Sequence, residues 1–127
     1  MKSIHFKCER EGSGFHRLSV VDRDTHKYCT CCWDITVNEA REVIGGWVYL
    51  HPIKKSEPSE FGGKIVDFEE VLLEEKGHPR RIALIFESRK EARKQIWRGK
   101  NYGMAFTGGP VPASFPHEYD NVQRPQR

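Results

Sequence analysis

The apolar residues of this chain occur in short runs bounded by turn-forming residues, a pattern that favours β-strands over long helices. The clearest runs are IALIF (82–86) and WVYL (47–50), and the second lies between Gly45-Gly46 and a proline-containing segment. Short runs rich in β-branched and aromatic residues are typical of buried strands. We therefore predict a strand at each, and no run reaches the length that crosses a membrane.

The N-terminal third of the chain predicts three further strands. Apolar residues alternate with polar ones over 4–8, and a second strand is expected through 18–21. The run KYCTCCWDI (27–35) follows a turn and has strong β character. Side chains two residues apart on a strand share a face, so Cys29 and Cys31 are expected to point into the core together.

The segment 65–86 allows two interpretations. Asp67 and Glu70 could cap a helix, or residues 65–73 and 81–86 could be two strands joined by the turn Gly77-His78-Pro79. We favour the two strands, because IALIF is strand-like and Gly-His-Pro is a compact turn signal.

Two capping-box patterns predict two short helices. Thr36 and Glu39 precede a helix over about 37–44 that ends at Gly45-Gly46. Ser88 and Glu91 precede a second helix that extends to about residue 98. The predicted fold class is α+β, with a β-dominated small curled sheet or pseudo-barrel and these two helices.

The length and composition predict one domain followed by a tail. The chain has 127 residues, of which 37% are hydrophobic, enough for a single core. Residues 1–106 are expected to form one globular α+β domain. Four prolines and a glycine pair in 107–127 predict a C-terminal tail that is mobile.

The charges are divided between two consecutive segments. Residues 57–75 hold seven acidic side chains and one lysine, and residues 76–100 hold nine basic and two acidic side chains. Runs of this kind are often solvated faces that offset each other, but a basic face can also contact phosphates.

The four cysteines bear on the cellular compartment and on metal binding. The N-terminus has no export signal, so we expect a cytoplasmic, reducing environment in which the cysteines are thiols. A zinc-stabilised fold is the alternative, because His5-x-x-Cys8 and His26-x-x-Cys29 have the same spacing and zinc takes four N or S ligands.

Two short motifs resemble those of a known family. Lys55-Ser56-Glu57-Pro58 resembles the KSEP signature of EVE domains, members of the PUA-like group of small β-barrels. The sequence WRGKNY (97–102) is similar to their Trp-x-Gly-x-x-Asn-Tyr element but is one residue shorter, and the order of the elements would have to be rearranged. The resemblance implies a pseudo-barrel with an aromatic-lined pocket that reads a modified or flipped base. In that analogy the pocket or its rim is formed by Lys55, Ser56, Trp97, Asn101 and Tyr102.

These observations favour a non-catalytic binding module for nucleic acid or a nucleotide-like ligand, with no cofactor and no membrane partner. Bases stack on aromatic rings while phosphates pair with cations. The predicted phosphate-contacting residues are Arg89, Lys90, Arg93, Lys94, Arg98 and Lys100. No catalytic triad or metal-protease motif argues for an enzyme. The remaining alternative is a protein-interaction domain, such as a phage or defence-associated accessory factor, which docks through the tail.

Overall fold

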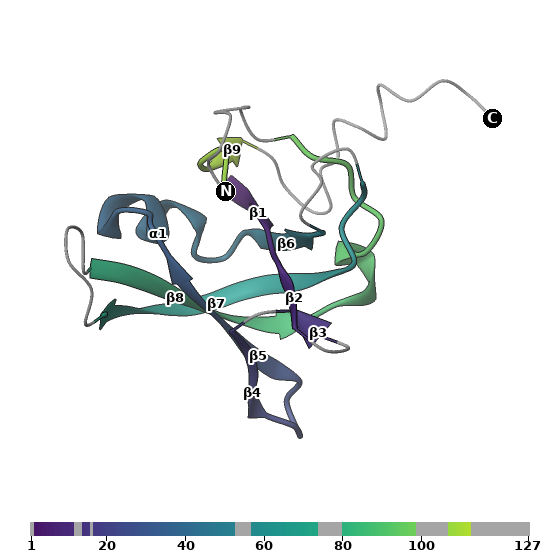
Figure 1. The fold of residues 1–127 in the computed structure, drawn as a ribbon, viewed down its shortest axis with the longest axis horizontal. Coiled ribbons are helices and arrows are strands. Elements are labelled where there is room, and N and C mark those ends of the chain that lie inside the picture. The colour runs from purple at the N-terminus through teal and green to yellow at the C-terminus, as the bar shows by residue number, and fades with distance from the viewer. Residues whose placement is uncertain are drawn as a thin grey trace.

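A seven-stranded sheet organises the chain (Figure 1), and the computed structural model describes residues 2–11, 14–15, 17–52, 57–73, 80–98 and 107–112. The strands are β1 (Lys2–Lys7), β2 (Arg10–Glu11), β3 (Gly14–Phe15), β4 (Leu18–Asp22), β5 (Lys27–Trp33), β6 (Trp47–His51), β7 (Phe61–Leu72), β8 (Arg80–Ser88) and β9 (Val111–Pro112). The helix is α1 (Val37–Val43), and a 3-10 turn, η1, spans Lys90–Ala92. The prediction that strands dominate the fold is confirmed.

The sheet is open. Its strand order is β4-β5-β8-β7-β6-β1-β9, and β2 and β3 form a separate two-stranded sheet. Neighbouring strands are antiparallel except β1 and β6, which are parallel. The predicted curled sheet or pseudo-barrel differs from this arrangement, because closure requires the two edge strands, here β4 and β9, to pair with each other.

The neighbouring strands β1 and β6 are covered on both faces. All five residues of β6 are buried, as the apolar run WVYL predicts. Val48 and Leu50 belong to the main hydrophobic core, whereas Trp47 and Tyr49 form a second cluster with Ala92. Because successive side chains of a strand point to opposite faces, the two clusters lie on opposite sides of the sheet.

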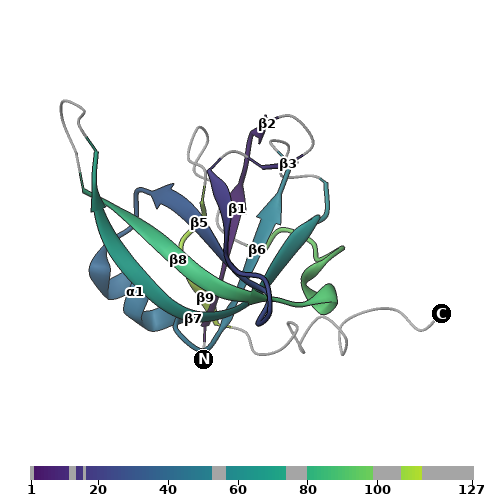
Figure 2. The same ribbon diagram turned by 90° about the horizontal axis from the view of Figure 1, so that it is seen from below.

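The helix α1 begins as predicted. The Thr36 hydroxyl accepts from the N–H of Glu39, and the Glu39 carboxylate accepts from the N–H of Thr36. The helix packs its buried residues Ala40 and Val43 into the main core, near β1, β7 and β8 (Figure 2). It ends where Gly45 takes a left-handed φ of 85°. Among the described residues, no helix is long and apolar enough to cross a membrane.

Residues 61–72 and 80–88 form two long antiparallel strands rather than a capped helix. β7 pairs with β8 from Gly63 opposite Ser88 to Leu72 opposite Arg80, with one irregularity between Ile65 and Asp67. The preference for strands is therefore confirmed. The predicted turn at 77–79 lies outside the described residues.

The second predicted helix is wrong. Residues 90–92 form only the turn η1, no side chain caps it, and the chain continues without regular structure through residue 98. The backbone of Lys94 has a positive φ of 63° and its N–H donates to the carbonyl of Ser59. Long-range hydrogen bonds to Ser59 replace those that a helix would make within the segment.

The start of the predicted tail is part of the sheet. Val111 and Pro112 in β9 pair with Ser3 and Lys2 of β1, and Thr107 forms an isolated bridge with Phe6. Residues 107–112 therefore lie along the edge of the sheet, at the start of the segment expected to form the tail. Residues 113–127 lie outside the described part of the chain.

Candidate ligand-binding site

Ser59 joins two segments that are far apart in the sequence. Its N–H donates to the carbonyl of Gln95 (2.9 Å), and its carbonyl accepts from the N–H of Lys94 (2.7 Å). Its hydroxyl donates to the carbonyl of Ala92 (2.5 Å) and accepts from the N–H of Gln95 (2.9 Å). Ser59 is 2% exposed, so water does not compete for these bonds. The residue directly after the KSEP motif thus holds the segment that leads to Trp97.

An open hollow of about 380 Å³ lies where these segments meet, and we call it the Ser59 recess. Its lining consists of Glu57, Pro58, Ser59, Glu60, Arg93 and Lys94. Two carboxylates therefore line the same hollow as two cations. This combination offers acceptors for amino groups as well as donors for an anion.

A cluster of aromatic and histidine rings adjoins the recess. The ring of His5 stacks on Tyr49 with centroids 4.7 Å apart. Trp97 contacts both histidines, with its ring centroid 5.6 Å from that of His5 and 5.2 Å from that of His51. The cluster reaches the recess through His51, whose Nδ1 lies 2.9 Å from the carbonyl oxygen of Glu57.

The two histidines form a hydrogen-bonded pair. The Glu57 carbonyl can only accept, so Nδ1 of His51 donates to it and Nε2 is left as an acceptor. Nδ1 of His5 lies 2.6 Å from that Nε2 and donates to it. Both residues are fully buried. Desolvation, together with the nearby charge of Arg98, lowers the pKa of His51 to about 4, so the ring is neutral at pH 7.

Of the five predicted pocket residues, the structure describes Trp97. It is half-buried within the ring cluster rather than displayed on a helix. Lys55, Ser56, Asn101 and Tyr102 lie outside the described residues, and their convergence on Trp97 stays a prediction.

Four of the predicted phosphate-contacting cations are exposed. Lys90, Arg93 and Lys94 lie on and just after η1, and Arg93 and Lys94 line the Ser59 recess. Arg89 is also exposed, but its guanidinium forms an ion pair with Glu87 at 2.8 Å. The basic surface therefore exists as a turn and an extended segment, not as the predicted helix.

The two remaining predicted phosphate-contacting residues are Arg98 and Lys100. Arg98 is half-buried, and its guanidinium donates to the Ile96 carbonyl (3.0 Å) and to the Gln95 side-chain oxygen (3.1 Å). These bonds hold it against its own segment. Lys100 lies outside the described residues.

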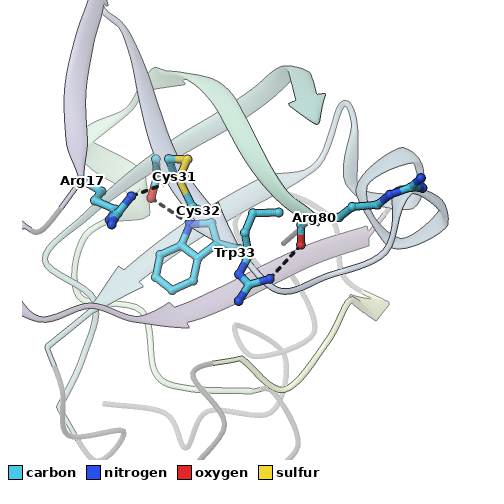
Figure 3. Close-up of a disulfide and its surroundings, with 7 residues drawn as sticks. Arg17, Cys31, Cys32, Trp33 and Arg80 are labelled. Atoms are coloured by element: carbon cyan, nitrogen blue, oxygen red, sulfur yellow. Dashed lines mark hydrogen bonds between the residues drawn. A yellow bond between two sulfur atoms is a disulfide. The ribbon is translucent and has the colours of Figure 1, made fainter. Parts of the chain in front are cut away.

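A second and larger hollow, of about 500 Å³, lies beside the end of β5, and we call it the Cys31–Cys32 hollow. Its lining consists of Lys7, Cys8, Glu9, Arg17, Cys31, Cys32, Trp33, Asp34, Arg81 and Thr107. Cys31 and Cys32 are joined by a disulfide, and the peptide bond between them is cis. Figure 3 shows the guanidinium of Arg17 beside this pair, with Nη1 3.6 Å from Sγ of Cys32.

The prediction that all four cysteines are thiols is wrong for Cys31 and Cys32. The pairing of β5 with β8 shifts register between Thr30 and Trp33, so the simple alternation breaks down at these two residues. The other two cysteines are free. Burial raises the pKa of Cys8 to about 12, and burial and the charge of Glu69 raise the pKa of Cys29.

The zinc alternative is not supported by the positions of its ligands. His5 is bonded to His51 in the ring cluster, whereas Cys8 lines the Cys31–Cys32 hollow. His26 is exposed in the turn before β5, and Cys29 is half-buried in that strand. In the described part of the chain, no three His, Cys, Asp or Glu side chains are grouped so that they could hold a metal ion.

Two features of these sites were missed from the sequence. The role of Ser59 has no local signal, because all its partners are more than thirty residues away. The Cys31–Cys32 pair has no clear signal either, because adjacent side chains of a regular strand point to opposite faces, and the register shift between Thr30 and Trp33 arises only from pairing with β8.

Comparison with known proteins returned no match, whether with family models, curated proteins or solved structures. The resemblance to EVE domains therefore remains a hypothesis that rests on residues 55–58 and 97–102.

Proposed function

We propose that this protein is a non-catalytic binding module of the cytoplasm that binds nucleic acid or a nucleotide-like ligand at the Ser59 recess. The observation that carries the proposal is the junction at Ser59. It brings the end of the KSEP motif against the exposed cations Arg93 and Lys94 and leaves a hollow between them.

The chemistry of the recess suits such a ligand. Arg93 and Lys94 pair with phosphate oxygens, which position a nucleic acid without reading its sequence. The carboxylates of Glu57 and Glu60 accept hydrogen bonds from the amino groups of bases. Trp97 is only half-buried and lies beside His51, whose ring bonds the Glu57 carbonyl at the recess, in keeping with the base-binding pocket that the EVE resemblance implies.

The proposal is tested by fluorescence anisotropy with labelled single-stranded RNA and DNA oligonucleotides. Two to four phosphate contacts on a single strand predict an affinity that falls about 7- to 50-fold between 50 and 200 mM salt. The double variant R93E/K94E should bind at least about tenfold more weakly than the wild-type protein.

The matched control is R23E/R41E, which makes the same change in net charge at exposed residues of the β4–β5 turn and α1. It should bind within about threefold of the wild-type protein, because neither residue lines the recess. Equal losses of affinity in the two variants would show that binding depends only on the net charge of the protein and not on the recess. No salt-dependent binding by the wild-type protein would refute the proposal in favour of the protein-interaction alternative.

A further inference from the structure

The Cys31–Cys32 hollow combines a disulfide, a cation and access from solvent. Both cysteines are partly exposed and line the hollow. A hollow of about 500 Å³ lies in the range that accommodates small molecules. A molecule that enters it therefore meets the disulfide directly.

Arg17 is placed to make the two sulfur atoms unequal. Its Nη1 lies 3.6 Å from Sγ of Cys32, and its carbonyl accepts from the N–H of Cys31 at 3.2 Å. A guanidinium next to sulfur stabilises a thiolate there and favours its departure as a leaving group. Cys32 is therefore the better leaving thiolate, and Cys31 is the sulfur that an incoming thiol attacks.

The other two thiols of the chain do not compete for this disulfide. Cys8 lines the same hollow, but burial holds its pKa at about 12 and almost none of it is thiolate at neutral pH. The pKa of Cys29 is also raised. Because the thiolate is the attacking species, an external thiol is the effective partner.

We propose that the Cys31–Cys32 pair is a site of thiol–disulfide exchange with a low-molecular-weight thiol that enters the hollow. The thiolate of this molecule attacks Sγ of Cys31, the bond between the two cysteine sulfurs breaks, and Cys32 leaves as a thiolate beside Arg17. A second thiolate then attacks the sulfur of the bound molecule. This releases Cys31 as a thiolate, and both cysteines take up protons. In total, two external thiols are oxidised to one disulfide while the protein disulfide gains two electrons and two protons.

The direction of attack is tested with glutathione as the probe and the full-length protein. The reaction is quenched with acid and N-ethylmaleimide, and the tryptic peptide 28–41, which contains Cys29, Cys31 and Cys32, is fragmented in a mass spectrometer. We expect glutathione on Cys31 and N-ethylmaleimide on Cys32. The reverse assignment would overturn the proposal, as would four free thiols in protein that was incubated with oxidised dithiothreitol.

The role of Arg17 is tested by the rate of reduction with dithiothreitol at pH 7. Arg17→Gln should slow the reduction roughly three- to tenfold, because the Cys32 thiolate loses its cation. Arg17→Lys keeps a cation and should restore most of the rate. It also keeps the test valid if Arg17→Gln fails to fold, as judged by near-ultraviolet circular dichroism.

The matched control is Arg23→Gln, which removes an exposed arginine at the other end of the β4 strand. Its reduction rate should stay within about twofold of wild type, because a distant exposed charge is screened by salt. Equal rates for Arg17→Gln, Arg23→Gln and the wild-type protein would overturn the assigned role of Arg17.

Discussion

The two faces of the neighbouring strands β1 and β6 are equally buried but are built from different chemistry. Phe6 and Leu50 are cross-strand partners on one face and belong to the main apolar core. His5 and Tyr49 are the preceding partners in the same register and stack as rings on the other face. Packing on the first face is stabilised by burial of apolar area, which has no directional requirement. Packing on the second face is stabilised by oriented ring contacts and by a hydrogen-bonded histidine pair. Substitutions on the first face should therefore change stability according to the side-chain volume that they remove. The contribution of the second face to stability should also depend on pH.

The largest expected effect comes from the apolar face. Phe6 is fully buried and stacks on Trp33 with ring centroids 4.1 Å apart. Phe6→Ala should lower the free energy of unfolding by about 4 kcal/mol, because it removes apolar burial and leaves a cavity. Urea denaturation at pH 7 measures this loss. Val20→Ala, on the exposed edge strand β4, is the control and should change stability by less than about 0.5 kcal/mol. A Phe6→Ala loss below about 1 kcal/mol would contradict the assignment of this face as the core.

A smaller effect distinguishes the ring face by pH. The folded-state pKa of His51 is about 4, below its ordinary value of 6.5, so its contribution is complete above pH 6.5 and declines as the pH falls toward 4. Over this window the loss is about 3 kcal/mol, because the unfolded chain takes up the proton first. Urea denaturation at pH 7 and pH 4 measures it.

His51→Gln is the comparison for this titration, since Gln can donate to the Glu57 carbonyl but does not titrate. Its free energy of unfolding should fall less between the two pH values than that of the wild-type protein. Identical pH dependences would rule out His51 as the group responsible.

The smallest of the three effects concerns the junction next to the ring face. Ser59→Ala removes the hydroxyl that bonds Ala92 and Gln95 and leaves the Gln95 N–H without this acceptor. The free energy of unfolding should fall by about 2 kcal/mol, the cost of a buried polar group that loses its partner. Hydrogen exchange should also become faster at Gln95 itself. Ser19→Ala on exposed β4 serves as the control, and unchanged exchange at Gln95 would show that the Ser59 hydroxyl does not hold the Gln95 N–H.

The elements that the sequence predicts correctly are those with complete local signals. The Thr36–Glu39 capping box starts α1, and the short apolar runs become β6 and β8. The second helix has a similar capping pattern at Ser88 and Glu91 but only a few apolar residues to bury. Its backbone therefore gains more from bonding to Ser59 than from helical bonds that remain exposed to solvent.

The candidate site was predictable only in part. The motifs at 55–58 and 97–102 direct attention to two segments, and Trp97 does lie against His51, close to the first of them. The residues that make the junction, Ser59 and Gln95, carry no motif of their own. The Cys31–Cys32 hollow was missed because its lining comes from strands that are neighbours only after the chain folds.

The sequence by itself determined the strand-rich character of this protein, the start of its helix and its exposed basic segment. These follow from hydrophobic periodicity, capping and solvation of charge, which act over a few residues. Only the tertiary structure decided that His5 and His51 pair, that Ser59 holds the basic segment, and that Arg17 adjoins Cys32. These contacts join residues 15 to 46 positions apart, and no local pattern specifies which distant donor will meet which acceptor.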